Sequence, residues 1–203
     1  MPERYKPIAT PGSLPNNYQE VLSWKVTEKP IRIININILG LFLFVIFGFI
    51  FSRLAIGLGN LPSQGEFKFG LGAIIFIIAG APLTLVLHEL AHGLVMQLFG
   101  ARPKYGILRK QMLFYATSPG YAYRRNNYLD IALAPFILIS ILAVLGMWLL
   151  QGTVWAVLFG ICGVINASGA AGDLWITVMV LRYPAIAYII DERDGIRVFL
   201  PKS

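Results

Sequence analysis

The sequence predicts an all-α membrane protein with about four transmembrane helices, and three observations carry this prediction. Hydrophobic residues make up 57% of the 203 residues and charged residues only 13%, whereas soluble domains carry roughly 25% charged residues. Four apolar runs each reach the roughly 20 residues that a helix needs to cross a bilayer. The basic residues behind the net charge of +7 lie between these runs rather than in one tract.

The apolar runs follow one another along the chain with polar segments between them. They cover residues 33–58, 69–100, 128–150 and 154–181. The last two are separated only by a short turn around Gln151-Gly152, so we expect them to form an antiparallel helical hairpin. Pro82 lies inside the second run, where it favours a kink or a break in the helix.

The distribution of lysine and arginine predicts the orientation in the membrane. Of the 17 basic residues, Arg53 and Lys68 lie on one side of the predicted spans and all the others on the opposite side. Loops rich in lysine and arginine stay in the cytoplasm. We therefore expect both termini and the 101–127 loop to be cytoplasmic, in a multi-pass protein of the cell membrane.

Three segments result from this assignment. They are a polar cytoplasmic N-terminal segment (1–32), a transmembrane catalytic core (33–184) and a cytoplasmic C-terminal tail (185–203). Residues 1–32 show no short apolar stretch followed by a small-residue cleavage site, so no removable signal peptide is expected.

The 101–127 loop contains two apolar and aromatic stretches on either side of a basic turn. The stretches are Tyr105 to Leu108 and Met112 to Tyr115, and their spacing suits a small β-hairpin. An irregular basic loop held by anionic lipid headgroups explains the same pattern, and the sequence leaves both interpretations open.

The second apolar run contains His88-Glu89-Leu90-Ala91-His92, which has the HExxH pattern of zinc metalloproteases. On a helix, residues four apart share a face, so the imidazoles of His88 and His92 can bind one Zn²⁺ ion. Glu89 can take a proton from a water that the metal activates. A short motif can also arise by chance as a structural polar cluster. Here its histidines are the only two in the chain and lie in an apolar run, where ionisable groups are costly and mark functional sites.

A catalytic zinc site usually has three protein ligands, and Asp173 is the predicted third. It is an acidic residue well inside the fourth apolar run. If the second and fourth runs both enter the membrane from the outer side, His88 and Asp173 each lie about 19 residues into their helices, and so at similar depth. Asp130, at the cytoplasmic edge of the third run, is better explained as a solvated helix cap.

Asn166 lies seven residues before Asp173, which places it two helical turns away on the same face. Its side chain could bind a substrate carbonyl or the developing oxyanion. It could equally hydrogen-bond between helices, and the sequence leaves these two roles open.

Together these motifs resemble membrane zincin peptidases related to the site-2 protease class of intramembrane metalloproteases. The resemblance rests on the HExxH motif in one span and on Asn166 with Asp173 in a later one, and it covers most of residues 33–184. It implies cleavage of peptide bonds at or near the membrane. It also implies His88, His92 and Asp173 as zinc ligands and Glu89 as the catalytic base.

The predicted function is that of a zinc-dependent, membrane-embedded endopeptidase whose partners are a membrane protein or peptide substrate and the lipid bilayer, with no role for nucleic acid. A hairpin in residues 101–127 could hold the substrate as an added strand. A protease that opens to a soluble substrate is a variant of this prediction. Two other classes stay open: a non-catalytic membrane scaffold that binds a metal, and a metal transporter. The transporter has less support, because the ionisable groups are concentrated in two spans.

Overall fold

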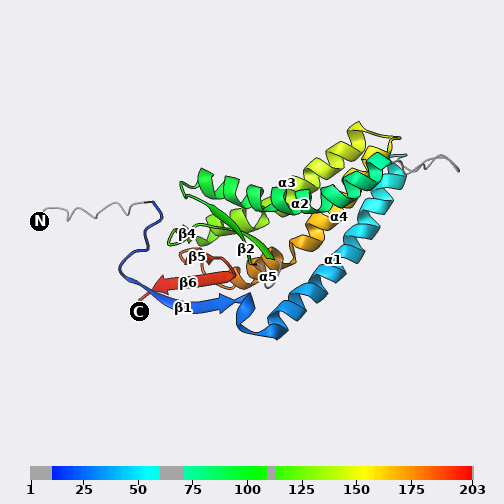
Figure 1. Ribbon diagram of the computed structural model, residues 1–203. Coiled ribbons are helices and arrows are strands. Elements are labelled where there is room, and N and C mark those ends of the chain that lie inside the picture. Colours follow the sequence, from blue (N-terminus) through cyan, green and yellow to red (C-terminus); the bar gives the residue numbers. More distant parts are fainter. Residues whose placement is uncertain (1–10, 60–70, 109–112, 203) are drawn as a thin grey trace, which may run out of the picture.

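The computed structural model describes residues 11–59, 71–108 and 113–202, which form helices at one end of the molecule and strands at the other (Figure 1). The strands are β1 (Tyr18–Lys25), β2 (Lys104–Leu108), β3 (Leu113–Thr117), β4 (Ala122–Arg124), β5 (Tyr188–Glu192) and β6 (Gly195–Pro201). The helices are η1 (Val26–Glu28), α1 (Pro30–Gly57), α2 (Leu71–Leu98), α3 (Arg125–Leu149), α4 (Val154–Gly169) and α5 (Ala171–Val180).

The four apolar runs form the long helices, as predicted, although the predicted start of the second run at Phe69 lies outside the described residues. α2 continues through Pro82. In the described chain, three helices are long and apolar enough to cross a membrane, or four if the bent pair α4 and α5 counts as one span. Only 11% of the most apolar window of α1 is buried. Soluble proteins rarely expose so continuous an apolar surface, which suggests a membrane protein.

The fourth run is not one straight helix, and this corrects one prediction. α4 ends at Gly169 and α5 begins at Ala171, and the two helices are bent by 44° relative to each other. Glycine disfavours a helix interior relative to alanine, and both Gly169 and Gly172 flank the bend. Asn166 and Asp173 therefore lie on different helices rather than two turns apart on one face.

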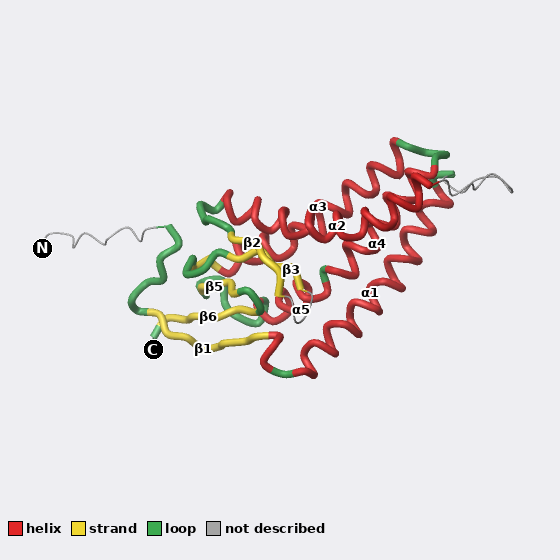
Figure 2. The backbone as a smooth tube through the Cα atoms, in the orientation of Figure 1, coloured by secondary structure: helices red, strands yellow, loops and turns green. Residues whose placement is uncertain are grey.

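The predicted all-α class is correct for the helices but misses a four-stranded antiparallel sheet, whose strand order is β1-β6-β5-β4 (Figure 2). This sheet joins the predicted N-terminal segment to the predicted C-terminal tail, as the 3.4 Å ion pair between Glu20 and Arg197 illustrates. Ile189, Ile196 and Val198 of β5 and β6 have no exposed surface. β1, from the start of the chain, adds to the β5–β6 hairpin at its end, and the resulting antiparallel sheet can pack one face on the core.

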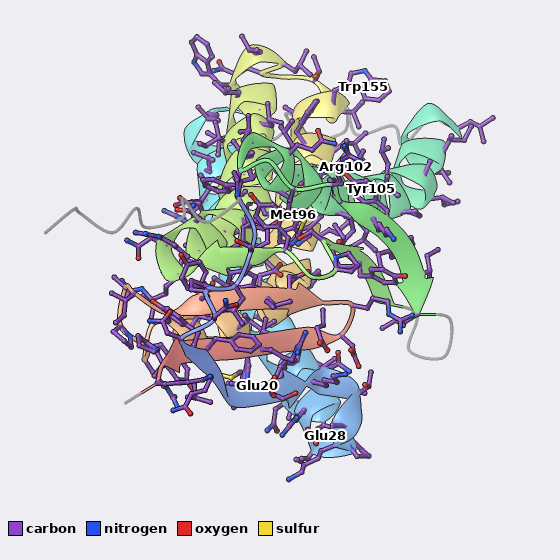
Figure 3. All side chains as sticks on the ribbon, turned by 90° about the vertical axis from the view of Figure 1, so that its left-hand side faces the viewer. Glu20, Glu28, Met96, Arg102, Tyr105 and Trp155 are labelled. Carbon is purple, nitrogen blue, oxygen red and sulfur yellow. The ribbon has the colours of Figure 1, made fainter. Side chains whose placement is uncertain are left out.

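The hairpin in the 101–127 loop is present. β2 and β3 pair antiparallel in a sheet of their own, and the turn that joins them (109–112) lies outside the described residues. The hairpin packs on α2, where a Cβ at Gly93 would clash with the hydroxyl of Tyr105. Figure 3 looks onto the sheet end and marks Tyr105 on this hairpin. Glycine at position 93 thus lets the hairpin lie close to the HExxH motif.

Candidate metal centre

The helices bring His88, His92 and Asp173 together into a group that could hold a metal ion. His88 Nε2 lies 2.9 Å from Asp173 Oδ2, and His92 Nε2 lies 3.3 Å from Asp173 Oδ1. The candidate ligand atoms of the three residues all lie within 4.8 Å of one another. The two histidines come from successive turns of α2, and the aspartate comes from the first turn of α5.

Both histidines are oriented by hydrogen bonds from the opposite ring nitrogen. His88 Nδ1 donates to Asn166 Oδ1 at 3.0 Å, and His92 Nδ1 donates to the backbone carbonyl of Ile131 at 2.9 Å. A protonated Nδ1 leaves the lone pair of Nε2 available to a metal. Histidine ligands of metal sites almost always have such an outer partner.

This donor set fits zinc. Two imidazole nitrogens and a carboxylate oxygen are zinc's usual ligands, and a tetrahedral site with bonds of 2.0–2.1 Å separates its ligands by about 3.3 Å. The observed separations of 2.9 and 3.3 Å between the aspartate oxygens and the imidazole nitrogens are close to this value. His88 and His92 are 4% and 7% exposed, so a metal here would be held away from bulk solvent.

Asn166 has no exposed surface. Its Oδ1 accepts the hydrogen bond from His88, and its Nδ2 donates to the backbone carbonyls of Pro135 and Phe136 at 3.2 and 3.4 Å. The amide thus links α2, α3 and α4. Of the two roles that the sequence left open, this arrangement favours the hydrogen bond between helices, because the amide has no free donor for a substrate carbonyl.

Glu89 lies beside the three ligand candidates in one cleft of about 470 Å³, within the ~300–1,000 Å³ typical of ligand sites. The backbone of Ala116 on β3 hydrogen-bonds to the Glu89 carboxylate. This contact places the hairpin directly against the group that the sequence predicts as the base. Asp130, the alternative acid considered from the sequence, is exposed and lies outside this group.

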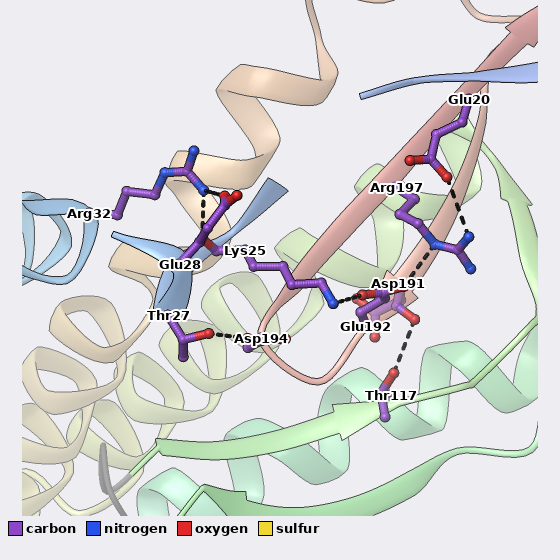
Figure 4. Close-up of polar contacts among 10 residues, drawn as sticks. All are labelled: Glu20, Lys25, Thr27, Glu28, Arg32, Thr117, Asp191, Glu192, Asp194 and Arg197. Atoms are coloured by element: carbon purple, nitrogen blue, oxygen red, sulfur yellow. Dashed lines mark hydrogen bonds and ion pairs between the residues drawn. The ribbon is translucent and has the colours of Figure 1, made fainter. Parts of the chain in front are cut away.

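The turn between β5 and β6 also lines the cleft, and acidic residues lie in this turn and at the end of β5 just before it. Two of these acidic residues have partners on β1, β6 and η1 (Figure 4). Glu192 forms ion pairs with Lys25 at 3.0 Å and with Arg197 at 2.7 Å, and Asp194 accepts a hydrogen bond from Thr27. The sheet that the sequence did not predict thereby covers one side of the cleft.

Asp191, which lies in the predicted C-terminal tail (185–203), is buried beside the cleft and contacts two other elements. Tyr128 of α3 donates to its Oδ1 at 3.0 Å, and Thr117 of β3 donates to its backbone carbonyl at 3.2 Å. Its Oδ2 is buried and has no hydrogen-bond partner within the described residues. Burial raises the pKa of Asp191 to about 7, despite the hydrogen bond from Tyr128. The preceding Ile189-Ile190 pair was the one sequence signal of its burial.

The stability of the folded protein is therefore expected to fall as the pH rises from about 4 to about 7. The unfolded chain ionises Asp191 near the ordinary aspartate pKa of 3.8, whereas the folded chain holds the proton up to a pKa of about 7. The stabilisation of the neutral form is complete below the unfolded pKa and is lost as the pH rises to the folded one. At about 1.4 kcal/mol per pKa unit the loss is on the order of 4 kcal/mol.

Thermal unfolding in detergent between pH 4.5 and pH 7.5 measures this effect. The melting temperature of the wild type should fall over this range, and that of Asp191→Asn should fall much less, since asparagine keeps the acceptor for Tyr128. Equal slopes for the two proteins would contradict the assignment of the effect to Asp191.

A family model described as "Putative zincin peptidase" matches residues 81–188, just over half of the 203-residue chain. The chain belongs to this family. The matched segment of the zincin peptidase family contains the HExxH motif, Asn166 and Asp173. Its description suggests a zinc peptidase, in agreement with a three-residue group that could bind a metal.

The chain is similar to a protein from Pyrococcus woesei that is described as "Uncharacterized 24.7 kDa protein in gap 5'region". The two sequences are 30% identical over 121 residues, which is 58% of this chain. The chain spans about half the length of that relative, because the aligned part covers 51% of it. No solved structure matches the chain.

Proposed function

We propose that this protein is a zinc-dependent endopeptidase, similar to site-2 proteases, that hydrolyses peptide bonds in or near the bilayer. The observation that carries the proposal is the convergence of His88, His92 and Asp173 beside Glu89 in one cleft. His88, His92 and Asp173 would bind the zinc ion. The ion would supply a Lewis acid that activates water and polarises a peptide carbonyl.

Glu89 would act as the general base of the reaction. Its carboxylate lies in the cleft next to the ligand group, so it can take a proton from the attacking water. It can then deliver that proton to the nitrogen of the leaving amine, which completes hydrolysis without a free charged amide ion. The hydrogen bond from Ala116 holds the carboxylate in place during both transfers.

The arrangement of the sheet supports a cytoplasmic position for both termini and for the 101–127 loop. Strands from all three segments meet at the same end of the long helices (Figure 1). Most of the described basic residues belong to these segments. In this orientation the cleft opens on the cytoplasmic side of the apolar helices, where water can reach Glu89.

Chelation tests the proposal directly. Purified protein in detergent should cleave a fluorescence-quenched peptide library, lose that activity in 1,10-phenanthroline and regain it when Zn²⁺ is added back. Cleavage that survives complete removal of the metal would exclude a zinc mechanism. Zinc binding without cleavage of any peptide would favour the non-catalytic scaffold, and metal uptake into vesicles that depends on His88 would favour the transporter.

Asn166→Ala is expected to weaken zinc binding rather than to remove the site. The substitution removes the acceptor of His88 Nδ1 but leaves all three proposed ligands, and loss of such an outer partner costs roughly 10- to 100-fold in metal affinity. Competition with a fluorescent chelator measures the change. Asn166→Asp should recover only part of the affinity, since its carboxylate accepts from Nδ1 but places an oxygen against the carbonyls of Pro135 and Phe136. An unchanged affinity in Asn166→Ala would contradict this role.

A further inference from the structure

The wall of the cleft that α1 forms carries one amide among apolar residues. The residues of this wall recur at helical spacing, which places them on one face of α1. They are Ile33, Ile36, Asn37, Gly40 and Leu41. Asn37 is exposed, and its side chain has no hydrogen-bond partner within the described part of the chain.

α1 is one of the helices apolar enough to cross a membrane, and Asn37 is the polar side chain that it brings to this wall of the cleft. Its exposed amide is available to a ligand that supplies hydrogen-bonding groups. A carboxamide has one acceptor oxygen and two N–H donors, so Asn37 can bind the N–H and the C=O of an extended peptide at the same time.

A second wall of the cleft presents backbone groups of the same kind. Ala116 directs its backbone toward Glu89, and residues two apart in a strand direct their backbone groups to the same side. Phe114 of β3, which lines the cleft, therefore presents its N–H and C=O on the edge of β3 that is not paired with β2. β3 packs on α2 whereas α1 packs on α4 and α5, so they line the cleft from different sides.

We propose that Asn37 binds the substrate backbone on the edge opposite β3. A peptide that adds to β3 as a strand satisfies the backbone groups on one edge and leaves those on its other edge unpaired. Asn37 would bind these remaining groups, with the peptide lying over Glu89. This inference rests on the proposed peptidase function, and it names the substrate class as an extended segment. A helical segment already uses its backbone groups internally and would not fit.

Peptide binding to the Glu89→Gln variant tests the inference without relying on turnover. The probe is a fluorescently labelled form of whichever library peptide the wild type cleaves best, and its anisotropy reports the dissociation constant. Asn37→Leu in this background should weaken binding roughly tenfold, as loss of hydrogen bonds to buried backbone groups does. Asn37→Ala should do the same, and the zinc content of every variant should stay equal.

Asn35→Leu is the matched control, because Asn35 lies on the same helix but does not line the cleft. It should leave the dissociation constant unchanged. An ester in place of the peptide amide that faces Asn37 should weaken binding to proteins that keep Asn37 and have no further effect in Asn37→Leu. Esters at amides that face β3 should weaken binding to both proteins. Equal affinities for the Asn37 and Asn35 variants would overturn the inference while leaving the peptidase function intact. A wild type that cleaves no peptide would overturn the peptidase function and this inference with it.

Discussion

Replacing Glu89 with glutamine should abolish peptide hydrolysis while leaving the zinc content of the protein unchanged. Glutamine keeps the size and the polarity of the side chain but cannot take a proton from water. General acid–base catalysis contributes about 10²- to 10⁴-fold to a rate, so a loss in this range or larger is expected in kcat. Because glutamine has a carbonyl oxygen that can accept from the Ala116 backbone, the hairpin should stay in place.

Hydrolysis of a quenched peptide and zinc analysis by mass spectrometry, carried out on the same preparation, measure both parts of this result. Glu28→Gln is a suitable control, because Glu28 is an exposed residue that pairs with Arg32 at 2.6 Å, and it does not line the cleft. That variant should keep full activity. Activity of Glu89→Gln near the wild-type level would remove Glu89 from the mechanism and would require another base.

His88→Ala and Asp173→Ala should each release the zinc that the wild type binds. Each substitution removes one of three ligand candidates and leaves a site with two. The loss of affinity should exceed the roughly 10- to 100-fold that an outer partner contributes. The wild type is expected to hold one zinc per chain after dialysis against a weak chelator, and both variants should hold little or none.

Asp130→Ala is the control for this experiment, since Asp130 is exposed and lies outside the ligand group. It should retain zinc at the wild-type level. Of the His88 and Asp173 variants, the Asp173 variant is the more informative. The ligand role of Asp173 was predicted from its position in an apolar run, its estimated depth and the family resemblance, and not from the HExxH motif. Equal zinc in the wild type and both variants would refute the site.

The long helices and the grouping of the three candidate ligands could be predicted because each depends on local or nearly local patterns. An apolar run of about 20 residues specifies a helix whatever it packs against, and the spacing of His88 and His92 fixes their common face. The position of Asp173 required one non-local assumption, that two spans enter from the same side. The structure brings Asp173 to 2.9 Å from His88 even though the bend after Gly169 moves it onto a separate helix.

The sheet could not be predicted in the same way. Its strands are three to eight residues long, and a strand this short is specified mainly by what it pairs with. Asp191 lies in the segment that the sequence predicts as the C-terminal tail, next to other acidic residues. Only the tertiary structure shows that Tyr128 and Thr117 enclose it. The role of Asn166 depended likewise on its neighbours, the carbonyls of α3.

The pairing of β1 with β6 has a consequence for how the molecule is assembled during synthesis. Glu20 and Arg197, which meet across these two strands, are 177 residues apart. β1 therefore leaves the ribosome before any of the long helices, and it has no partner until β6 follows all of them. Since the β5–β6 turn lines the cleft, the cleft is completed only after the helices have been made. A nascent chain would thus carry both histidines long before it has the surroundings needed to use them.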